Sequence, residues 1–268
     1  MSMNFRKAHS ISITGGKGGV GKTSITLKIA KVLSEWGHRV LVLDCDYNLS
    51  NTMVKLRLPV NNDFYLYMTG RKSFEECLHR MGNFHLFPGC NGNLDVFNSG
   101  VKLDKVVVDI LVKVEGSYDF ILLDCPAGIS KDALTLNAYT DFRFFVINPD
   151  FSSITDSYSL IKILNQSFCI RENHCVINKI TNYRQYQRIV KVLSETVENF
   201  LESRLSILGP LFKEDGDGEI FDSSLMGKES KNHRYMIRML KEFTENNFGI
   251  NPFIKQPLIQ FGNRINSA

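Results

Sequence analysis

The run Gly15-Gly16-Lys17-Gly18-Gly19-Val20-Gly21-Lys22-Thr23-Ser24 lies near the start of the chain and decides its fold class. It follows a short apolar segment, residues 10–14, and precedes a segment with helical apolar periodicity, residues 24–36. A strand, a glycine-rich loop and a helix in this order are the setting in which a phosphate-binding loop occurs. The glycines let backbone N–H groups turn toward the β-phosphate, and the helix directs its positive end there. We therefore expect a P-loop; the alternative is an ordinary glycine-rich turn.

Lys22 and Thr23 carry the chemistry expected of such a loop. The lysine ammonium neutralises the β- and γ-phosphate oxygens, and the threonine hydroxyl ligates Mg²⁺. These two residues indicate a nucleoside triphosphate and Mg²⁺ as cofactors, without identifying the base. The predicted nucleotide-binding residues of the loop are Gly16, Lys17, Gly18, Gly19, Val20, Gly21, Lys22, Thr23 and Ser24.

Apolar runs alternate with helical patterns along the rest of the chain. Predicted strands lie at 10–14, 39–44, 84–87, 119–124, 143–147 and 175–177, and predicted helices at 24–36, 103–114 and 231–243. Further helices are expected after Asn148 and Asn178, and Pro210 interrupts a strand-like run at 205–212. This order predicts an α/β fold, a mostly parallel P-loop NTPase sheet with helices on both faces. Without repeats or linkers, we expect one domain over residues 1–250 and a tail over 251–268.

Composition is that of an ordinary soluble globular protein, with 43% hydrophobic and 22% charged residues in 268. No apolar run of about 18 residues and no signal-peptide pattern are present, so we expect a cytoplasmic protein. A net charge of +4 permits a polyanionic partner without predicting one. The six cysteines and six histidines show no zinc spacing, so we expect reduced core cysteines and no metal site made from them.

Carboxylates follow two of the predicted buried strands. Asp44 and Asp46 come at the end of the strand at 39–44, and Asp124 ends the strand at 119–124. Parallel strands bring such residues to the carboxyl edge of the sheet, where open α/β folds bind their ligands. An aspartate-rich turn after a strand is the alternative reading for the first pair.

Lys17 is a second lysine at the start of the loop, and the run from Lys17 to Thr23 resembles the deviant Walker A of the MinD/ParA ATPases. The resemblance implies an ATP-dependent homodimer that sandwiches two ATP molecules and dissolves on hydrolysis. It also implies catalytic roles for Lys17, which reaches the partner subunit's nucleotide, and for Asp46, which orients the attacking water. By the same resemblance, Thr23 ligates Mg²⁺ directly, whereas Asp44 and Asp124 act on it through water.

Four further segments extend this resemblance. Asn51 matches an asparagine of the first switch, and Cys125-Pro126-Ala127-Gly128-Ile129 is similar to the second switch, which places Pro126 and Gly128 there. Residues 148–158, with Ser153 and Asp156, resemble the segment that lines the dimer interface. Asn178 falls where the family reads the adenine edge; the alternative is that it caps the next helix.

Within the family, residues 153–164 look closest to the FlhG branch (also called FleN or YlxH), which regulates flagellar number. This implies partners such as an FlhF-like GTPase, a transcription factor or a flagellar switch protein. Three departures are visible: the N-terminal extension that activates FlhF is nearly absent, Asn48 replaces a usual glycine, and the C-terminus lacks a long amphipathic helix.

The sequence leaves other roles open: MinD-like septum placement, ParA-like DNA or cargo positioning, and a nucleotide-dependent scaffold with little turnover. A basic stripe on the last helix, formed by Lys231, Arg234, Arg238 and Lys241, fits DNA or an anionic membrane, or is simply a solvated face. DNA is the less favoured partner. The tail at 252–265 is mixed apolar and basic, which fits peripheral contact with the cell membrane or packing against protein.

Overall fold

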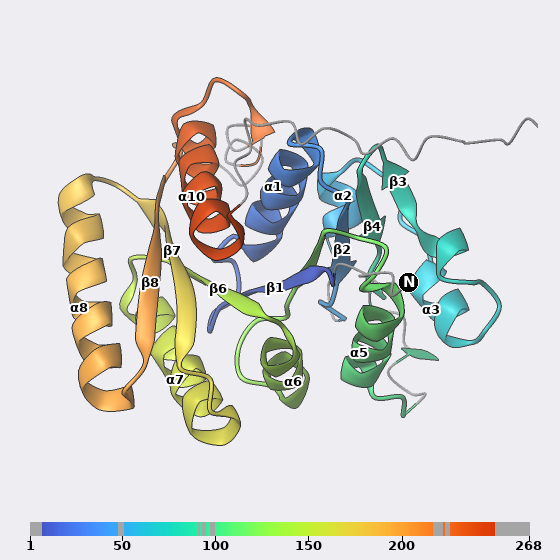
Figure 1. The fold of residues 1–268 in the computed structure, drawn as a ribbon, viewed down its shortest axis with the longest axis horizontal. Coiled ribbons are helices and arrows are strands. Elements are labelled where there is room, and N and C mark those ends of the chain that lie inside the picture. Colours follow the sequence, from blue (N-terminus) through green and yellow to red (C-terminus); the bar gives the residue numbers. More distant parts are fainter. Residues whose placement is uncertain are drawn as a thin grey trace, which may run out of the picture.

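The computed structural model describes residues 7–47, 51–90, 92, 95–96, 100–216, 222 and 226–249. Within them, eight strands form one sheet in the order β3-β4-β2-β5-β1-β6-β7-β8 (Figure 1). The strands are β1 (His9–Thr14), β2 (Val40–Asp44), β3 (His79–Met81), β4 (Phe84–Phe87), β5 (Phe120–Asp124), β6 (Phe142–Ile147), β7 (Glu172–Ile180) and β8 (Arg204–Phe212). Every neighbouring pair is parallel except β3 and β4. The predicted mostly parallel sheet is confirmed.

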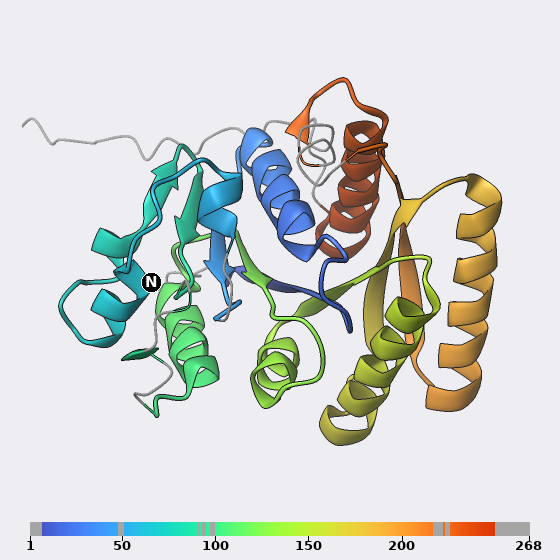
Figure 2. The same cartoon turned by 180° about the vertical axis from the view of Figure 1, so that it is seen from behind.

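Helices cover both faces of the sheet, as predicted. They are α1 (Lys22–Glu35), α2 (Thr52–Lys55), α3 (Asp63–Met68), α5 (Leu103–Val114), α6 (Lys131–Tyr139), α7 (Phe151–Phe168), α8 (Tyr183–Leu201) and α10 (Lys231–Phe248), with a 3₁₀ turn at Glu75–Cys77. Figures 1 and 2 show α1 and α10 on one face, α5, α6 and α7 on the other, and α8 beside β8. Because α7 and α8 pack on one apolar cluster, α8 belongs to the α7 face.

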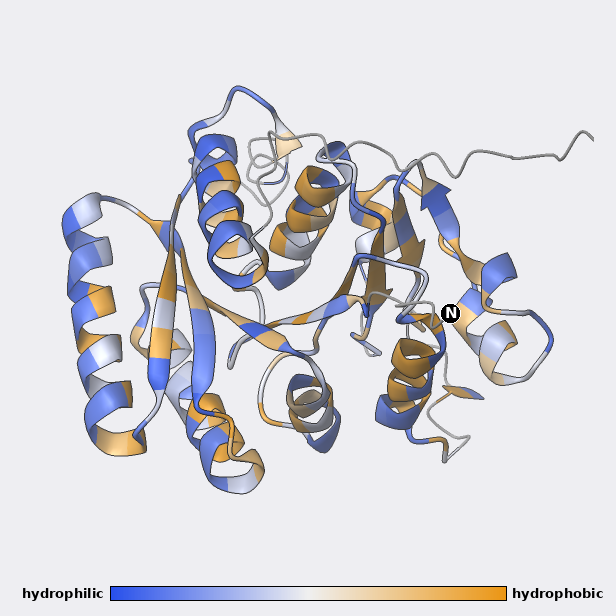
Figure 3. Ribbon diagram, viewed as in Figure 1, coloured by the Kyte–Doolittle hydropathy of each residue, from blue (hydrophilic) through white to orange (hydrophobic). Residues whose placement is uncertain are grey.

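The core follows from the alternation of side chains along buried strands. On the α1 and α10 face, Val42 and Phe144 belong to one cluster with both helices. On the opposite face, Leu43 and Ile121 pack with α3 and α5. Figure 3 shows the result: β2 and β4 are strongly hydrophobic, whereas α8 at the edge carries mostly hydrophilic residues.

One sequence prediction about the strands is wrong, and one strand lies outside the predictions. Pro210 does not interrupt β8, because β8 is an edge strand of the described sheet, where a missing backbone N–H is tolerated. The register with β7 shifts between Cys175 and Val176, just before Pro210 pairs with Ile177, so an irregularity accommodates the ring. The short antiparallel strand β3 was not predicted, because its three residues carry no strand-length pattern.

Five of the six cysteines are buried and all six are free, as expected of reduced core residues. Cys169 is the exception: it is exposed, because it ends α7 in a left-handed conformation with φ 57°. Among the described residues, no cluster of three or more histidine, cysteine, aspartate or glutamate side chains could hold a metal ion.

No helix in the described part of the chain is both long and apolar enough to cross a bilayer. The tail at 251–268 and Asn48 lie outside the described residues. The predictions made for them therefore stay predictions.

Candidate nucleotide-binding site

The P-loop connects β1 to α1, and its glycines are needed for three different reasons. Gly19 (φ 73°) and Gly21 (φ 104°) have left-handed backbones, which side chains rarely adopt. Gly16 lies against α7, because a Cβ there would stand 2.2 Å from the carbonyl carbon of Asp156. A Cβ on Gly15 would stand 2.7 Å from the Val146 oxygen, whereas one on Gly18 would meet nothing within 4 Å. The start of the loop, Gly15 and Gly16, therefore packs closely against β6 and α7, whereas Gly18 has open space around it.

Lys22 is the first residue of α1, directly after the loop, and it is buried. One turn later, Thr26 Oγ1 lies 3.0 Å from the Lys22 oxygen and 3.2 Å from Asp124 Oδ1. Ser24 Oγ donates to the carboxylate of Asp222, which also pairs with Lys55 of α2. The first turn of α1 is thus tied to the carboxylates around it.

Asp44 and Asp124 form a buried carboxylate pair at the carboxyl edge of the sheet. They stand opposite each other in the β2–β5 register, and each is 2% exposed. Burial, and then the charge of Asp44, raise the pKa of Asp124 to about 7, while hydrogen bonds from Thr23 and Thr26 oppose that shift. Thr52 Oγ1 donates to Asp44. Two adjacent buried carboxylates beside the Thr23 hydroxyl fit a divalent cation, because its charge offsets the cost of burying both.

The other predicted switch residues lie around this pair. The backbone N–H of Asp46 donates to Asp44 Oδ1 at 3.1 Å, and the Asp46 side chain is partly exposed. Asn51 is exposed at the N-cap of α2, where its side chain makes no capping hydrogen bond. Pro126 is buried, and Gly128 N–H donates to the Gly15 oxygen at 3.2 Å. The second predicted switch is therefore joined directly to the P-loop.

Lys17 does not point into its own loop. Its Nζ lies 2.8 Å from Asp150 Oδ1 and 2.8 Å from Ser152 Oγ, at the start of α7. The hydrogen bond from Lys17 is the main cause that lowers the pKa of Asp150 to about 2. Asp150 also caps α7 by accepting from the Ser153 N–H.

Ser153 and Asp156 take structural positions in the same helix. Ser153 is fully buried, and its Oγ accepts from the Asn148 N–H at 3.0 Å. Asp156 packs its backbone against Gly16, and the next residue, Ser157, accepts from the Gly16 N–H. Ser153 thus ties the start of α7 to the segment that follows β6, and Asp156 packs the helix against the P-loop.

Asn178 is fully buried at the end of β7, and its Nδ2 donates to the Val20 oxygen at 2.7 Å. The alternative prediction, that it caps the next helix, is wrong, because Asn182 is the N-cap of α8. The neighbouring Lys179, which sequence reasoning missed, donates from Nζ to the Gly19 oxygen at 2.8 Å. The end of β7 therefore holds the P-loop at two carbonyls.

Other residues of the site were missed as well. Thr26, Thr52 and Asp150 contact predicted site residues, yet no motif singles out the two threonines. For Asp150 and Lys179 a signal existed: each lies within two residues of an asparagine that ends a predicted strand, Asn148 or Asn178.

Residues 8–174 match the family model of an AAA domain, AAA_31, which spans more than half of the chain. The chain is 30% identical over 227 residues to the chloroplastic minD homolog of Arabidopsis thaliana, covering 81% of this chain and 67% of that protein. The chain belongs to the MinD/ParA family of P-loop ATPases. Members of this family bind ATP with Mg²⁺.

Two further MinD/ParA relatives carry names linked to regulation or to flagella. The antiactivator FleN of Pseudomonas aeruginosa is 26% identical over 200 residues, covering 74% of this chain and 71% of FleN. The flagellum site-determining protein YlxH of Helicobacter pylori is 29% identical over 194 residues, covering 70% of this chain and 65% of YlxH.

Solved MinD structures share the fold. MinD of Pyrococcus horikoshii, complexed with Mg-ADP, aligns with a TM-score of 0.73 at 23% identity and covers 89% of this chain and 97% of its own. The MinC:MinD complex of Aquifex aeolicus aligns with a TM-score of 0.66 at 27% identity, covering 89% of this chain and 96% of that one.

Two of the four cations in the basic stripe on α10 pair with carboxylates of the same helix. Arg238 pairs with Glu242 and Lys241 with Glu245, both at i,i+4 spacing. Lys231 Nζ lies 3.5 Å above the centre of the Phe212 ring. These contacts favour the solvated-face reading over a polyanion-binding surface.

Proposed function

We propose that this MinD/ParA ATPase is an MgATP-dependent dimerising switch that regulates flagellar number or placement. The observation that carries the dimer is Lys17, whose amine turns away from its own loop to the exposed start of α7. A lysine that only served its own nucleotide would point inward beside Lys22. In the dimer, the same amine would reach the partner subunit's nucleotide across this face.

The chemistry at each subunit follows from the residues around the loop. Lys22 would neutralise the β- and γ-phosphates, and Thr23 would ligate Mg²⁺, with Asp44 and Asp124 holding its bound water. Bound Mg²⁺ would offset charge on the phosphates. Asp46 stands at the rim of this pair, so its carboxylate would orient the attacking water. Asn178, beside Val20, would border the adenine.

The flagellar assignment is supported by the relatives FleN and YlxH, at 26% and 29% identity. An FlhF-like GTPase, a transcription factor or a flagellar switch protein would bind the ATP form, in the cytoplasm or at the inner face of the membrane. The paired charges on α10 weigh against DNA as the partner. Asn51, Pro126 and Gly128 would move with the nucleotide state.

Hydrolysis is tested with Asp46→Ala. We expect this variant to bind ATP and accumulate as dimer while phosphate release falls by about a hundredfold or more, the scale of losing a positioned catalytic group. Val54→Ala, 62% exposed on the neighbouring α2, serves as a control for general disturbance of this region. Unchanged phosphate release by Asp46→Ala would remove Asp46 from this role.

The partner is tested separately from hydrolysis. In co-sedimentation with DNA and with anionic liposomes, each with and without ATP, we expect no strong ATP-dependent binding to DNA. Pull-down of an FlhF-like GTPase by the Asp46→Ala dimer is the positive arm. Strong ATP-dependent DNA binding would replace the flagellar role with ParA-like positioning.

A further inference from the structure

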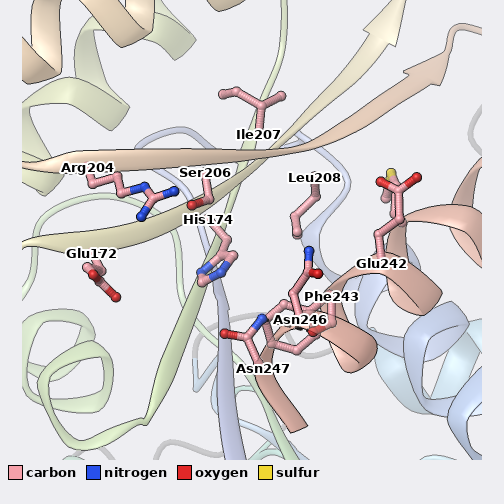
Figure 4. Close-up of a pocket in the computed structure, with 11 residues that line it drawn as sticks. Glu172, His174, Arg204, Ser206, Ile207, Leu208, Glu242, Phe243, Asn246 and Asn247 are labelled. Carbon is pink, nitrogen blue, oxygen red and sulfur yellow. Dashed lines mark hydrogen bonds between the residues drawn. The ribbon is translucent and has the colours of Figure 1, made fainter. Parts of the chain in front are cut away.

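A cavity of about 360 Å³ lies at the opposite edge of the sheet from the P-loop. Figure 4 shows it between β7, β8 and the C-terminal half of α10. Its residues on β7 are Glu172 and His174, at the amino end of a strand whose carboxyl end carries Asn178. A volume of this size suits a metabolite-sized ligand. The nucleotide site does not use this space.

The sheet register arranges the polar groups of this cavity in two rows. Glu172 on β7 stands opposite Arg204 on β8, and His174 stands opposite Ser206. Residues at paired positions of neighbouring strands place their side chains on the same face, and the strands lie about 4.8 Å apart. Figure 4 shows Glu172 and Arg204 together at one end of the cavity, with His174 and Ser206 in its middle.

The charged row is free to bind a ligand. Both Glu172 and Arg204 are exposed, and neither forms an ion pair with another residue that the structure describes. The other carboxylate in the lining, Glu242, is already paired with Arg238 at 2.8 Å. Within the described part of the chain, the cavity therefore offers one cation and one anion that form no salt bridge, with Arg143 near Glu172.

The inner row offers hydrogen bonds beside an apolar wall. His174 Nδ1 is buried and has no hydrogen-bond partner among the residues that the structure describes, and the ring meets Phe243 edge to face at 5.1 Å. Burial is the main cause that lowers the pKa of His174 to about 4, so the imidazole is neutral near pH 7. Phe243, Leu208 and Met239 supply the apolar part of the lining. Because Nδ1 itself is not accessible to solvent, a ligand in the cavity meets the remainder of this partly exposed ring.

We propose that this cavity binds a free α-amino acid, with its carboxylate on Arg204 and its ammonium on Glu172. The two charges of an α-amino acid are separated by a single carbon, which matches a cation and an anion on paired positions of neighbouring strands. The ligand's side chain lies over Phe243 and carries a polar group to His174 and Ser206. Arg204 binds the carboxylate through two parallel N–H donors.

The test is a thermal-shift screen of the proteinogenic amino acids at about 10 mM, followed by calorimetric titration of those that raise Tm. We expect at least one to raise Tm saturably. Arg204→Gln and Glu172→Gln should each weaken its Kd by about tenfold or more, because each removes one charge-assisted contact. Arg171→Gln is the matched control: it is exposed, next to β7 and outside the cavity, and should leave Kd unchanged.

Two ligand derivatives test the zwitterion without altering the protein. The methyl ester lacks the carboxylate charge and the N-acetyl derivative lacks the ammonium, so neither should bind comparably. N-acetyl derivatives that bind as tightly as the amino acid would replace the proposal with a simple anion site. No saturable shift from any amino acid, or an equal loss in Arg171→Gln, would overturn it. Unchanged ATP binding by the variants shows that they fold.

Discussion

Lys17 Nζ lies 2.8 Å from Asp150 Oδ1, so the second lysine of the P-loop is held by the start of α7 in its own chain. The Lys17 side chain is 43% exposed and the Asp150 side chain 44%. In the proposed dimer the same amine leaves Asp150 for the partner subunit's nucleotide. The ion pair therefore competes with assembly, and the competition is modest because the pair is solvated.

Asp150→Asn separates this ion pair from the helix cap, because asparagine caps a helix as well as aspartate does. We expect the variant to dimerise at an ATP concentration about two- to fivefold lower than the wild type, the range set by one exposed ion pair. Analytical ultracentrifugation over an ATP series measures it. Dimerisation that needs more ATP than the wild type would mean that Asp150 supports the dimer.

Gly16→Ala and Gly18→Ala form a matched pair within one loop. A Cβ on Gly16 would stand 2.2 Å from the Asp156 carbonyl carbon, whereas a Cβ on Gly18 meets nothing within 4 Å. Gly16→Ala should lower the free energy of unfolding by about 2 kcal/mol or more through forced separation of the loop from α7. Gly18→Ala should change it by less than about 0.5 kcal/mol. Urea unfolding measures both, and equal effects would contradict the packing described.

Lys28 in α1 carries a buried amine that has no hydrogen-bond partner in the described part of the chain. Burial is the main cause that lowers its pKa to about 8, so the amine is charged at pH 7 at a cost to the fold. Lys28→Met should raise the free energy of unfolding by about 1 kcal/mol, because an apolar side chain of similar length removes that cost.

Lys191→Met is the control for this substitution. The Lys191 side chain on α8 is 74% exposed, so its amine is already solvated and its removal should not stabilise the fold. Thermal unfolding compares the two variants. A lower Tm for Lys28→Met would show that the buried amine is needed.

His174 gives the fold a pH dependence on the acid side. Its pKa is about 4 in the folded chain against about 6.5 when unfolded. Since the folded pKa is depressed, the stability that neutral His174 contributes to the fold is fully present above about pH 6.5. It is lost as the pH falls toward 4. As the pH falls from about 6.5 to about 4, the free energy of unfolding should drop by about 1–2 kcal/mol less in His174→Phe than in the wild type. Denaturant unfolding at several pH values measures the difference, and parallel curves would contradict it.

The sequence predicts the sheet and the P-loop well because both depend on local patterns. Apolar runs that end in Asp44 and Asp124 specify buried strands, and the spacing of Gly21, Lys22 and Thr23 specifies the loop. What it does not predict depends on contacts between distant segments. No local pattern shows that Asp150 accepts a hydrogen bond from the Lys17 amine or that Lys179 donates to the Gly19 oxygen. Nor does one show that Asp156 packs against Gly16.

The cavity on β7 and β8 was beyond sequence reasoning for the same reason. Glu172 and Arg204 are separated by a whole helix in the chain and meet only through the strand register. Pro210 was misread because its tolerance depends on β8 being an edge strand, which is a property of sheet order.

The central claim, an ATP-gated dimer that uses Lys17 across the interface, is tested most directly by size-exclusion light scattering with and without ATP and Mg²⁺. The wild type and Asp46→Ala should shift from monomer to dimer with ATP, and Lys17→Ala should bind ATP yet remain monomeric. Lys22→Ala should lose both ATP binding and the dimer. A Lys17→Ala protein that dimerises with ATP as fully as the wild type would contradict the account.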